Sequence, residues 1–384
     1  MDGATPFLPQ EIVRNILKRL PVKSLVRFQC VSKEWKNLIK TPSFIADQLH
    51  HSSHQIPSLL LQQNYRNDPL RFYLLSREMR IFEVPNPPLM GSLLGAKIIG
   101  SSNGLVCVEI DRYGVSSPSL LLWNPSTREV RPLSVAMHGS DGDCALGFGF
   151  SPIVNDYKIV RTYAEYENAV KRVEVYSLST GSWKEIEFRN LEGVRVYSDF
   201  INVVTVNGAV FFYGANGIDE NAEDIDSLLV SFDIATEVFT VMPWPDLGYN
   251  STAYLTEHDN KLAIVCLTAN RRIFQVELWV MEEVTSASGK KSNWTKKYRS
   301  KSYPYFLMPV TMWGNEIICS VDVTERDEWE DDKPKAVICL FNVCTNESKF
   351  LTIHRGSRFR NIFNYVESLV PVGNIHIEEP RRQS

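Results

Sequence analysis

The sequence predicts an α+β, multidomain chain in which a short all-α module precedes an all-β, propeller-like domain of about six repeats. Three observations predict this fold class. Apolar residues recur at helical spacing up to about residue 50, short Val/Ile/Leu/Phe-rich runs then replace them, and one two-strand pattern recurs along the second region. With 384 residues, 44% of them hydrophobic, the chain can bury a core of this size.

The first region is predicted to form three or four short helices. Ile12, Ile16 and Leu20 lie four residues apart, as on one face of a helix. The expected boundaries are residues that break or cap helices, namely Pro9, Pro21, Ser32 and Thr41-Pro42. Because so small a bundle cannot cover all of its apolar surface, we expect it to pack against a partner.

A gap-free self-alignment defines the repeat of the second region. Each copy has an apolar strand with an aromatic residue, a turn that ends in Thr, and a second strand, which together predict a β-hairpin. The clear copies are LLLWNPSTREVRPL (120–133), VEVYSLSTGSWKEI (173–186), LLVSFDIATEVFTV (228–241) and VICLFNVCTNESKF (337–350). Weaker copies are RFYLLSREMRIFEV (71–84) and VELWVMEE (276–283), the latter with its hairpin enlarged by the polar loop TSASGKKSN.

The spacing of the repeat indicates a β-propeller. The aromatic residues Trp123, Tyr176 and Phe232 lie 53 and 56 residues apart. Further strand candidates lie between the hairpins: GLVCVEI, YKIVRTY, GAVFFYG, KLAIVCL and EIICSV. About four strands in each repeat of roughly 50 residues are typical of a propeller blade. A pair of packed antiparallel sheets is the alternative fold, and it explains the strands but not the period.

Composition restricts the class of partner and the compartment. The formal net charge of −4, from 41 basic and 45 acidic residues, gives no general attraction to nucleic acid or to an anionic membrane. Apolar runs fall short of the roughly 18 residues that cross a bilayer, and MDGATPFLPQE lacks the features of a signal peptide. The seven widely spaced cysteines predict free thiols. We therefore expect a cytoplasmic or nuclear protein that is not secreted.

No catalytic, metal-binding or cofactor-binding set is predicted. GSSNG (100–104) matches the nucleophile pattern G-x-S-x-G, but a strand instead of a helix follows it, so a tight turn is expected. GFG (147–149) lacks the third glycine of a dinucleotide site and predicts a turn or a bulge. His50 and His54 have the spacing of metal ligands, but no other ligand joins them, which indicates a solvated helix end.

Residues 7 to about 45 contain a series of short motifs: Leu8-Pro9-x-Glu11-Ile12, Ile16-Leu17-x-x-Leu20-Pro21, Ser24-Leu25, Cys30-Val31-Ser32-Lys33 and Trp35. Together these motifs resemble an F-box. It implies that this module binds a Skp-type adaptor, which links it to cullin and RING subunits. The adaptor-binding residues implied are Leu8, Pro9, Ile12, Ile16, Leu20, Pro21 and Leu25, with Val31 and Trp35 as an anchor shared between module and adaptor. For each aliphatic residue the alternative is a place in the module's own core.

The rest of the chain also contains recognisable segments, namely GSSNGLVC (100–107), WNPST (123–127), LGFGF (146–150), NDYK (155–158), VEVY (173–176), SWK (182–184) and ELWV (277–280). Together these segments resemble the plant F-box-associated interaction domain. LGFGFSPIVNDYK, VEVYSLSTGSWK and YVESLV (365–370) are most similar to the S-locus F-box and S-locus F-box-like group of the rose family. The implied domains are an F-box (5–50), the F-box-associated, propeller-like domain (56–376) and a polar tail (377–384).

The resemblance implies a substrate-recognition subunit of a Skp–cullin–F-box (SCF) ubiquitin ligase. Such a subunit is not an enzyme itself and needs no cofactor; it recruits a target protein for ubiquitination, and in the S-locus group the targets are style ribonucleases. Two alternatives are a propeller enzyme or small-molecule binder with a helical cap, and an F-box adaptor that does not direct degradation.

Two charged segments are candidate substrate-binding elements: DVTERDEWEDDKP (322–334) and GKKSNWTKKYRSKS (289–302). Both are expected to interrupt the strands as loops on one rim of the propeller. The acidic segment favours a basic substrate protein, and its candidate residues are Asp327, Glu328, Trp329, Glu330, Asp331 and Asp332. The alternative for either segment is a solvated loop.

Overall fold

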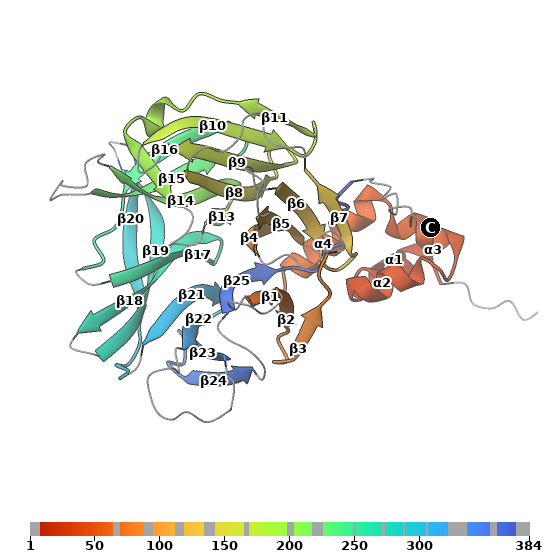
Figure 1. The fold of residues 1–384 in the computed structure, drawn as a ribbon. Coiled ribbons are helices and arrows are strands. Elements are labelled where there is room, and N and C mark those ends of the chain that lie inside the picture. Colours follow the sequence, from red (N-terminus) through yellow and green to blue (C-terminus); the bar gives the residue numbers. More distant parts are fainter. Residues whose placement is uncertain are drawn as a thin grey trace, which may run out of the picture.

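The computed structural model describes residues 8–63, 70–87, 95–111, 119–133, 143–164, 169–197, 203–216, 226–248, 251–270, 273–286, 289–304, 306–321, 336–353 and 359–373. Within them, four short helices precede six β-sheets arranged around an axis (Figure 1). The predicted order of an all-α module and a six-bladed, all-β domain is confirmed. Of the helices in these ranges, none combines the length and the apolar character that crossing a bilayer requires.

The helical module, residues 8–54, contains helices whose bounds follow the predicted breaks. They are α1 (Gln10–Leu17), α2 (Val22–Phe28), α3 (Lys33–Ile39) and α4 (Pro42–Ser53). A proline stands directly before each of the first two helices. Ser32 Oγ accepts a hydrogen bond from the Trp35 amide (3.1 Å), and Thr41 Oγ1 accepts one from the Phe44 amide (3.2 Å). Both side chains thus cap helix amides that lack an intrahelical partner.

The six sheets are propeller blades, numbered here in chain order and described from the inner to the outer strand. Blade 1 contains β25 (Phe359–Tyr365), β1 (Ser58–Gln63), β2 (Arg71–Leu75) and β3 (Ile81–Val84). Blade 2 contains β4 (Gly95–Ser102), β5 (Leu105–Asp111), β6 (Ser119–Asn124) and β7 (Glu129–Pro132). Blade 3 contains β8 (Asp143–Ser151), β9 (Asp156–Ala164), β10 (Val170–Ser177) and β11 (Ser182–Glu185).

The remaining blades follow the same order. In blade 4, β12 (Val194–Tyr197) and β13 (Val204–Val206) both pair with β14 (Ala209–Asn216), followed by β15 (Asp226–Asp233) and β16 (Val238–Pro243). Blade 5 contains β17 (Ser251–His258), β18 (Lys261–Asn270), β19 (Ile273–Ser286) and β20 (Gly289–Arg299). Blade 6 contains β21 (Leu307–Trp313), β22 (Glu316–Val321), β23 (Ala336–Asn342) and β24 (Ser348–Ile353).

The ring of blades is closed by the last strand of the chain. β25 pairs antiparallel with β1, so Tyr365 lies opposite Ser58. The inner strands β4, β8, β13, β17, β21 and β25 contact one another in this cyclic order. This pairing joins two distant parts of the chain in one blade, and the circular arrangement leaves few exposed sheet edges.

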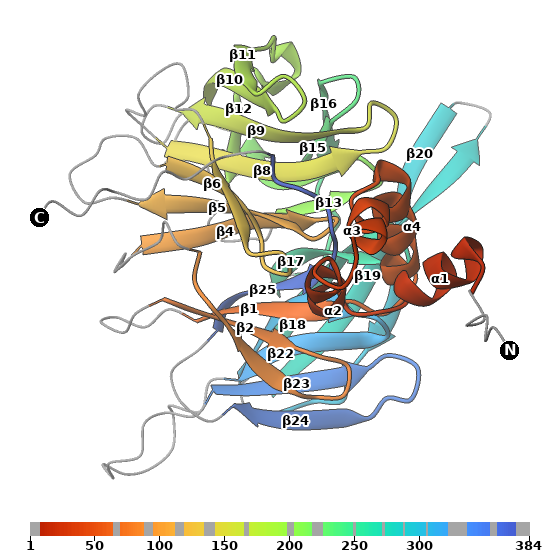
Figure 2. The ribbon, with the colours of Figure 1, turned by 90° about the vertical axis from the view of Figure 1, so that its right-hand side faces the viewer.

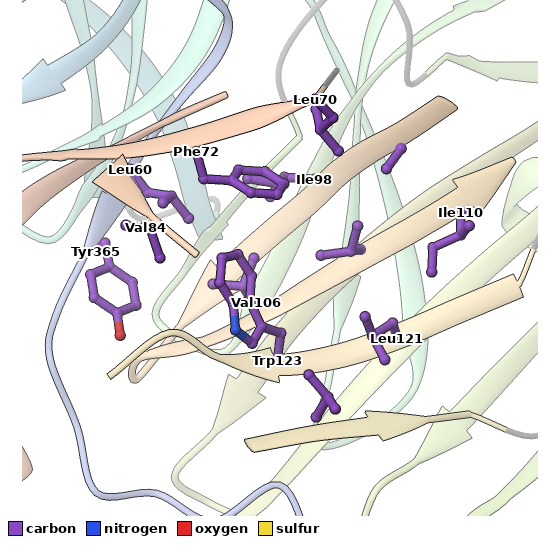
Figure 3. Close-up of a cluster of buried hydrophobic side chains, with 13 residues drawn as sticks. Leu60, Leu70, Phe72, Val84, Ile98, Val106, Ile110, Leu121, Trp123 and Tyr365 are labelled. Atoms are coloured by element: carbon purple, nitrogen blue, oxygen red, sulfur yellow. The ribbon is translucent and has the colours of Figure 1, made fainter. Parts of the chain in front are cut away.

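The aromatic repeat occupies the third strand of its blades. Trp123, Tyr176, Phe232 and Phe341 lie on β6, β10, β15 and β23 and are almost fully buried. In the seam between blades 1 and 2, the Trp123 ring packs against Phe72 with centroids 5.1 Å apart (Figure 3). The two weaker copies form hairpins as predicted, and their first strands, β2 and β19, are also the third strands of their blades. Each copy of the sequence repeat therefore corresponds to one blade.

The predicted turn chemistry is confirmed at the ends of these strands. Asn124 Oδ1 accepts hydrogen bonds from the amides of Ser126 (2.9 Å) and Thr127 (3.2 Å), and Asp233 Oδ1 accepts one from the Thr236 amide (2.7 Å). The residue after each repeat threonine has a left-handed φ: 64° at Arg128, 67° at Gly181, 58° at Glu237 and 59° at Asn346. This combination reverses the chain between the third and fourth strands.

Gly147 and Gly149 lie inside β8, so the predicted turn or bulge at GFG is wrong. Gly147 pairs with Val160 in a regular register. A Cβ atom added at Gly147 would lie 2.5 Å from Val210 Cγ1 and 2.6 Å from Phe212 Cζ. The missing side chain lets blade 3 approach blade 4 closely.

The basic segment 289–302 is mostly strand, so its prediction as a loop is wrong. It supplies the outer strand of blade 5, and β19 continues to Ser286 before the chain turns. The buried Glu277 carboxylate accepts hydrogen bonds from Lys296 Nζ (3.1 Å) and Arg299 Nε (2.6 Å). Burial alone would raise the pKa of Glu277, but the hydrogen bonds from these basic side chains lower it. Two of the basic residues therefore neutralise a carboxylate of their own blade.

Candidate functional site

The helical module exposes a set of apolar side chains. Leu8, Ile12, Ile16 and Val31 are 53%, 45%, 48% and 64% exposed. Leu8 precedes α1, the two isoleucines lie one turn apart on α1, and Val31 lies in the connection between α2 and α3. Val26 of α2 is also exposed. Several exposed large aliphatic residues on one small module indicate a surface that binds another protein.

The other residues implied for adaptor binding differ in exposure. Pro9 and Pro21 are exposed, and Leu20 and Trp35 are half-buried. Leu25 is fully buried in the core of the module, which favours the stated alternative of a core residue over adaptor binding. The reason is that the side of α2 on which Leu25 lies packs against the other helices.

One residue from the far end of the chain completes the module's core. We call residues 366–373, which follow β25, the C-terminal segment. Its Leu369 joins the buried cluster of Leu17, Val22, Leu25, Ile39 and Phe44. The Val22 amide donates a hydrogen bond to Glu367 Oε2 (3.2 Å), and Gln48 Nε2 donates one to the Glu367 carbonyl (3.4 Å). The C-terminal segment thus covers part of the apolar surface of the module. The exposed apolar side chains described above stay accessible to solvent.

The C-terminal segment is in turn fixed to the turns of blade 2. Asn124 Nδ2 donates hydrogen bonds to the carbonyls of Ser368 (3.0 Å) and Val370 (2.9 Å). Ser368 Oγ donates one to the carbonyl of Asn103 (2.7 Å). Because the same few residues contact both the propeller and the helices, they fix the position of the module relative to the blades.

The module lies on one of the two faces of the propeller (Figure 2). In antiparallel blades, the turns between first and second strands and between third and fourth strands end on the same side. The C-terminal segment crosses two of these turns, and Trp313 Nε1, beside a third, donates a hydrogen bond to the Pro57 carbonyl of the linker after α4 (2.6 Å). We call this side the module face and the opposite side the far face.

In sequence, the acidic segment 322–334 lies between β22 and β23. The last residue of β22 and the first residue of β23 are at the far face. The segment and its candidate residues Asp327 to Asp332 lie outside the described residues. Their substrate-binding role therefore stays a prediction.

A small cavity of about 80 Å³ lies where the inner strands meet. All six inner strands line it, through residues that include Ser101, Phe148, Thr205, Glu257, Thr311 and Asn364. Among the described residues that line the cavity, Glu257 is the one with an ionisable side chain, and burial raises the pKa of its carboxyl group. Ligand pockets usually occupy about 300 Å³ or more, so this axial space is smaller than an ordinary ligand pocket.

The described residues contain no cluster of three or more His, Cys, Asp or Glu that could hold a metal ion. In GSSNG the first three residues belong to β4, and Asn103 and Gly104, with φ of 50° and 80°, form the expected tight turn.

The ring of His54 forms a hydrogen bond with the carbonyl of His50 (2.7 Å). Burial raises the pKa of Cys266 to about 12, which keeps this thiol protonated and unreactive.

Comparison with protein families matches residues 6–47 to the F-box domain and residues 78–371 to the F-box associated beta propeller domain. The second match covers most of the chain and includes strands from all six blades. The chain belongs to this family. The helical module is its F-box, and the six blades form the family's propeller.

Relatives of similar architecture occur in Arabidopsis thaliana. An F-box/kelch-repeat protein is 25% identical over 320 residues, which cover 79% of this chain and 82% of the relative. F-box protein CPR1 is 28% identical over 314 residues, covering 76% and 72% of the two chains. Among solved structures, a chain of the nidogen/laminin complex aligns over 81% of this chain and 99% of its own, with 13% identity and a TM-score of 0.46. That likeness carries no argument about function.

Sequence reasoning missed two residues of this site, Val26 and Leu369. Val26 was hidden by the apolar residues around it in α2, since periodicity does not say which face of a short helix turns outward. Leu369 lies in the apolar run SLVPV (368–372), which follows the last strand without a hairpin partner. This apolar run, which belongs to no copy of the repeat, was the sequence feature that could have indicated a buried segment.

Proposed function

We propose that this protein is the substrate-recognition subunit of an SCF ubiquitin ligase. Its F-box binds a Skp-type adaptor and, through it, cullin and RING subunits, and its propeller holds the protein to be ubiquitinated. The observation that supports this most directly is the placement of the F-box. It is fixed to the module face with apolar side chains still exposed, and no described α-helix lies on the far face, where a second protein would bind.

The adaptor-binding surface we propose consists of the exposed residues Leu8, Pro9, Ile12, Ile16, Pro21 and Val31, with Val26 as an addition. Leu20 and Trp35, which are half-buried, contribute to both the F-box core and this surface. These aliphatic side chains are about half exposed, so burying the remaining apolar surface of each against a partner contributes about 1 kcal/mol. Several of them acting together are therefore needed for a lasting complex.

Positioning is the mechanism of this proposal. The protein supplies no reacting group; it holds its substrate near the ubiquitin-carrying subunits and so turns an encounter between separate molecules into one within a single complex. Leu369, Glu367 and Asn124 restrain the F-box against the blades, which limits the range of distances between substrate and enzyme. The rigid attachment supports a receptor more than a loosely tethered cap.

The finer assignments rest on local sequence alone. Recognition of style ribonucleases, as in the S-locus group, stays a prediction. So do the domain limits 5–50, 56–376 and 377–384 and a cytoplasmic or nuclear location. An F-box adaptor that does not direct degradation remains the second candidate, because it would share the same F-box surface.

The adaptor surface is tested with two isoleucines of equal exposure. Ile16 on α1 and Ile273 on β19 are both 48% exposed. On co-expression with a Skp-type adaptor, Ile16→Asp should weaken co-purification about tenfold or more, because a carboxylate replaces an apolar contact. Ile273→Asp should leave it unchanged. Full adaptor binding by a folded Ile16→Asp chain would show that the surface is assigned wrongly.

The ligase role is tested separately from adaptor binding. The chain is captured from cells of its source together with any cullin, and the turnover of co-captured proteins is followed with and without Ile16→Asp. We expect cullin to be captured and turnover to slow in the variant. Capture of the adaptor without cullin or altered turnover would favour the non-degradative adaptor.

A further inference from the structure

We propose that a pocket in the seam between blades 4 and 5 binds a lysine or arginine side chain of the substrate protein. The inference rests on the proposed function, since it names the chemistry by which the far face recognises its substrate. It requires no property of the acidic segment 322–334.

The pocket has a volume of about 640 Å³ and lies on the far face. It is formed by the end of β14, the start of β15 and the chain that leads from β16 to β17, and its principal lining residues are Tyr213, Asp226, Pro243, Trp244, Pro245 and Asp246. These connections run from second to third strand and from one blade to the next, so they end opposite the F-box. A side chain bound here leaves the adaptor surface accessible.

The aromatic wall of the pocket is held in place before any ligand arrives. The rings of Tyr213 and Trp244 meet edge to face, with centroids 5.1 Å apart and planes at 88°. The Tyr213 hydroxyl forms a hydrogen bond with Ser227 Oγ (2.9 Å), and the Trp244 amide donates one to the Ser227 carbonyl (3.0 Å). Prolines on both sides of Trp244 restrict its backbone further. Fixed aromatic rings offer a cation an attractive surface at little entropic cost.

The polar part of the pocket is negative. Asp226 and Asp246 are exposed, and in the part of the chain that the structure describes neither forms a salt bridge. Asp246 Oδ1 accepts one hydrogen bond, from the Gly248 amide (3.0 Å). An anionic ligand would be repelled here, and an apolar side chain would leave the carboxylates without compensation.

The chain itself shows the type of contact we propose. Arg195 on β12 places its guanidinium 5.5 Å from the ring centroid of Tyr197 and donates a hydrogen bond to the Tyr197 hydroxyl (3.1 Å). The Tyr197 ring lies 5.6 Å from the ring of Tyr213, so Tyr197, Tyr213 and Trp244 form one aromatic row. Arg195 occupies one end of this row, and at the other end the described lining residues of the pocket supply aromatic rings and carboxylates but no cation.

The test uses the full chain bound to its Skp-type adaptor and synthetic peptides that differ only in a central Arg, Lys, norleucine or Glu. Binding is measured by fluorescence polarisation. We expect the Arg and Lys peptides to bind at least about fivefold more tightly than the norleucine peptide, from cation–π and charge pairing together. Equal binding of the cationic and norleucine peptides, or binding of none up to millimolar concentration, would overturn the proposal.

Variants of the lining residues test whether a preference for cationic peptides arises at this pocket. The double variant Asp226→Asn, Asp246→Asn should remove the preference for cationic peptides, and Trp244→Leu should weaken it. Glu185→Gln, which alters an exposed carboxylate on β11 of blade 3, should leave it intact. A preference retained by the double variant would place the cation site elsewhere. Competition by free spermidine as strong as that of the peptides would show that the ligand is a small cation and not a substrate side chain.

Failure of this proposal can be told apart from failure of the proposed function. Co-purification of the adaptor is recorded on the same samples. If the adaptor is retained and peptide preference is absent, only the pocket assignment is wrong. If Ile16→Asp keeps the adaptor, the F-box surface is wrong whatever the peptides show.

Discussion

Replacing Leu369 with alanine should loosen the F-box from the propeller. Leu369 is 7% exposed and packs in the F-box core although it belongs to the C-terminal segment. The change removes three carbon atoms, which at about 0.8 kcal/mol each amounts to about 2.4 kcal/mol, before any cost of the cavity left behind. A loss of this size raises the population of the undocked F-box about 50-fold.

Hydrogen exchange followed by mass spectrometry measures this undocking directly. In Leu369→Ala, amides of residues 10–53 should exchange about 50-fold faster, with the inner strands of the propeller unaffected. Leu133, which is 8% exposed and lies in the core between blades 2 and 3, provides the matched control because Leu133→Ala removes the same atoms. This control should destabilise the propeller without a selective effect on the helices.

Two outcomes would refute the reasoning. Unchanged exchange in residues 10–53 of Leu369→Ala would mean that the F-box core is complete without the C-terminal segment. An equal acceleration over the whole chain would mean that F-box and propeller unfold as one unit, so that Leu369 contributes to global stability and not to docking.

Two further predictions concern the propeller. Burial raises the pKa of Glu257 in the folded state above that in the unfolded state, so the folded chain binds the proton more strongly and stability falls as the pH rises through the folded-state pKa. Glu257→Gln should therefore raise the melting temperature at pH 8 more than at pH 5, and a pH-independent difference would contradict this. Gly147→Ala should cost about 1–3 kcal/mol of unfolding free energy, since the new Cβ would lie 2.5 Å from Val210 Cγ1. A denaturant midpoint equal to that of the unchanged chain would show that the seam between blades 3 and 4 accommodates the added methyl group without loss of stability.

The sequence by itself determined the features that depend on neighbouring residues. Proline breaks and the caps Ser32 and Thr41 define helix ends through contacts within one turn. The hairpin repeat is equally local, because Asn124 and Asp233 bond to amides two or three residues ahead. This is why the blades and the F-box could be predicted.

Only the tertiary structure decided which residues meet across the chain. The pairing of β25 with β1, the insertion of Leu369 into the F-box core and the pocket between blades 4 and 5 join segments that no local pattern connects. The polar strand β20 escaped prediction for a related reason. An outer strand leaves much of its surface in water, so its composition resembles that of a loop, and only its pairing with β19 shows what it is.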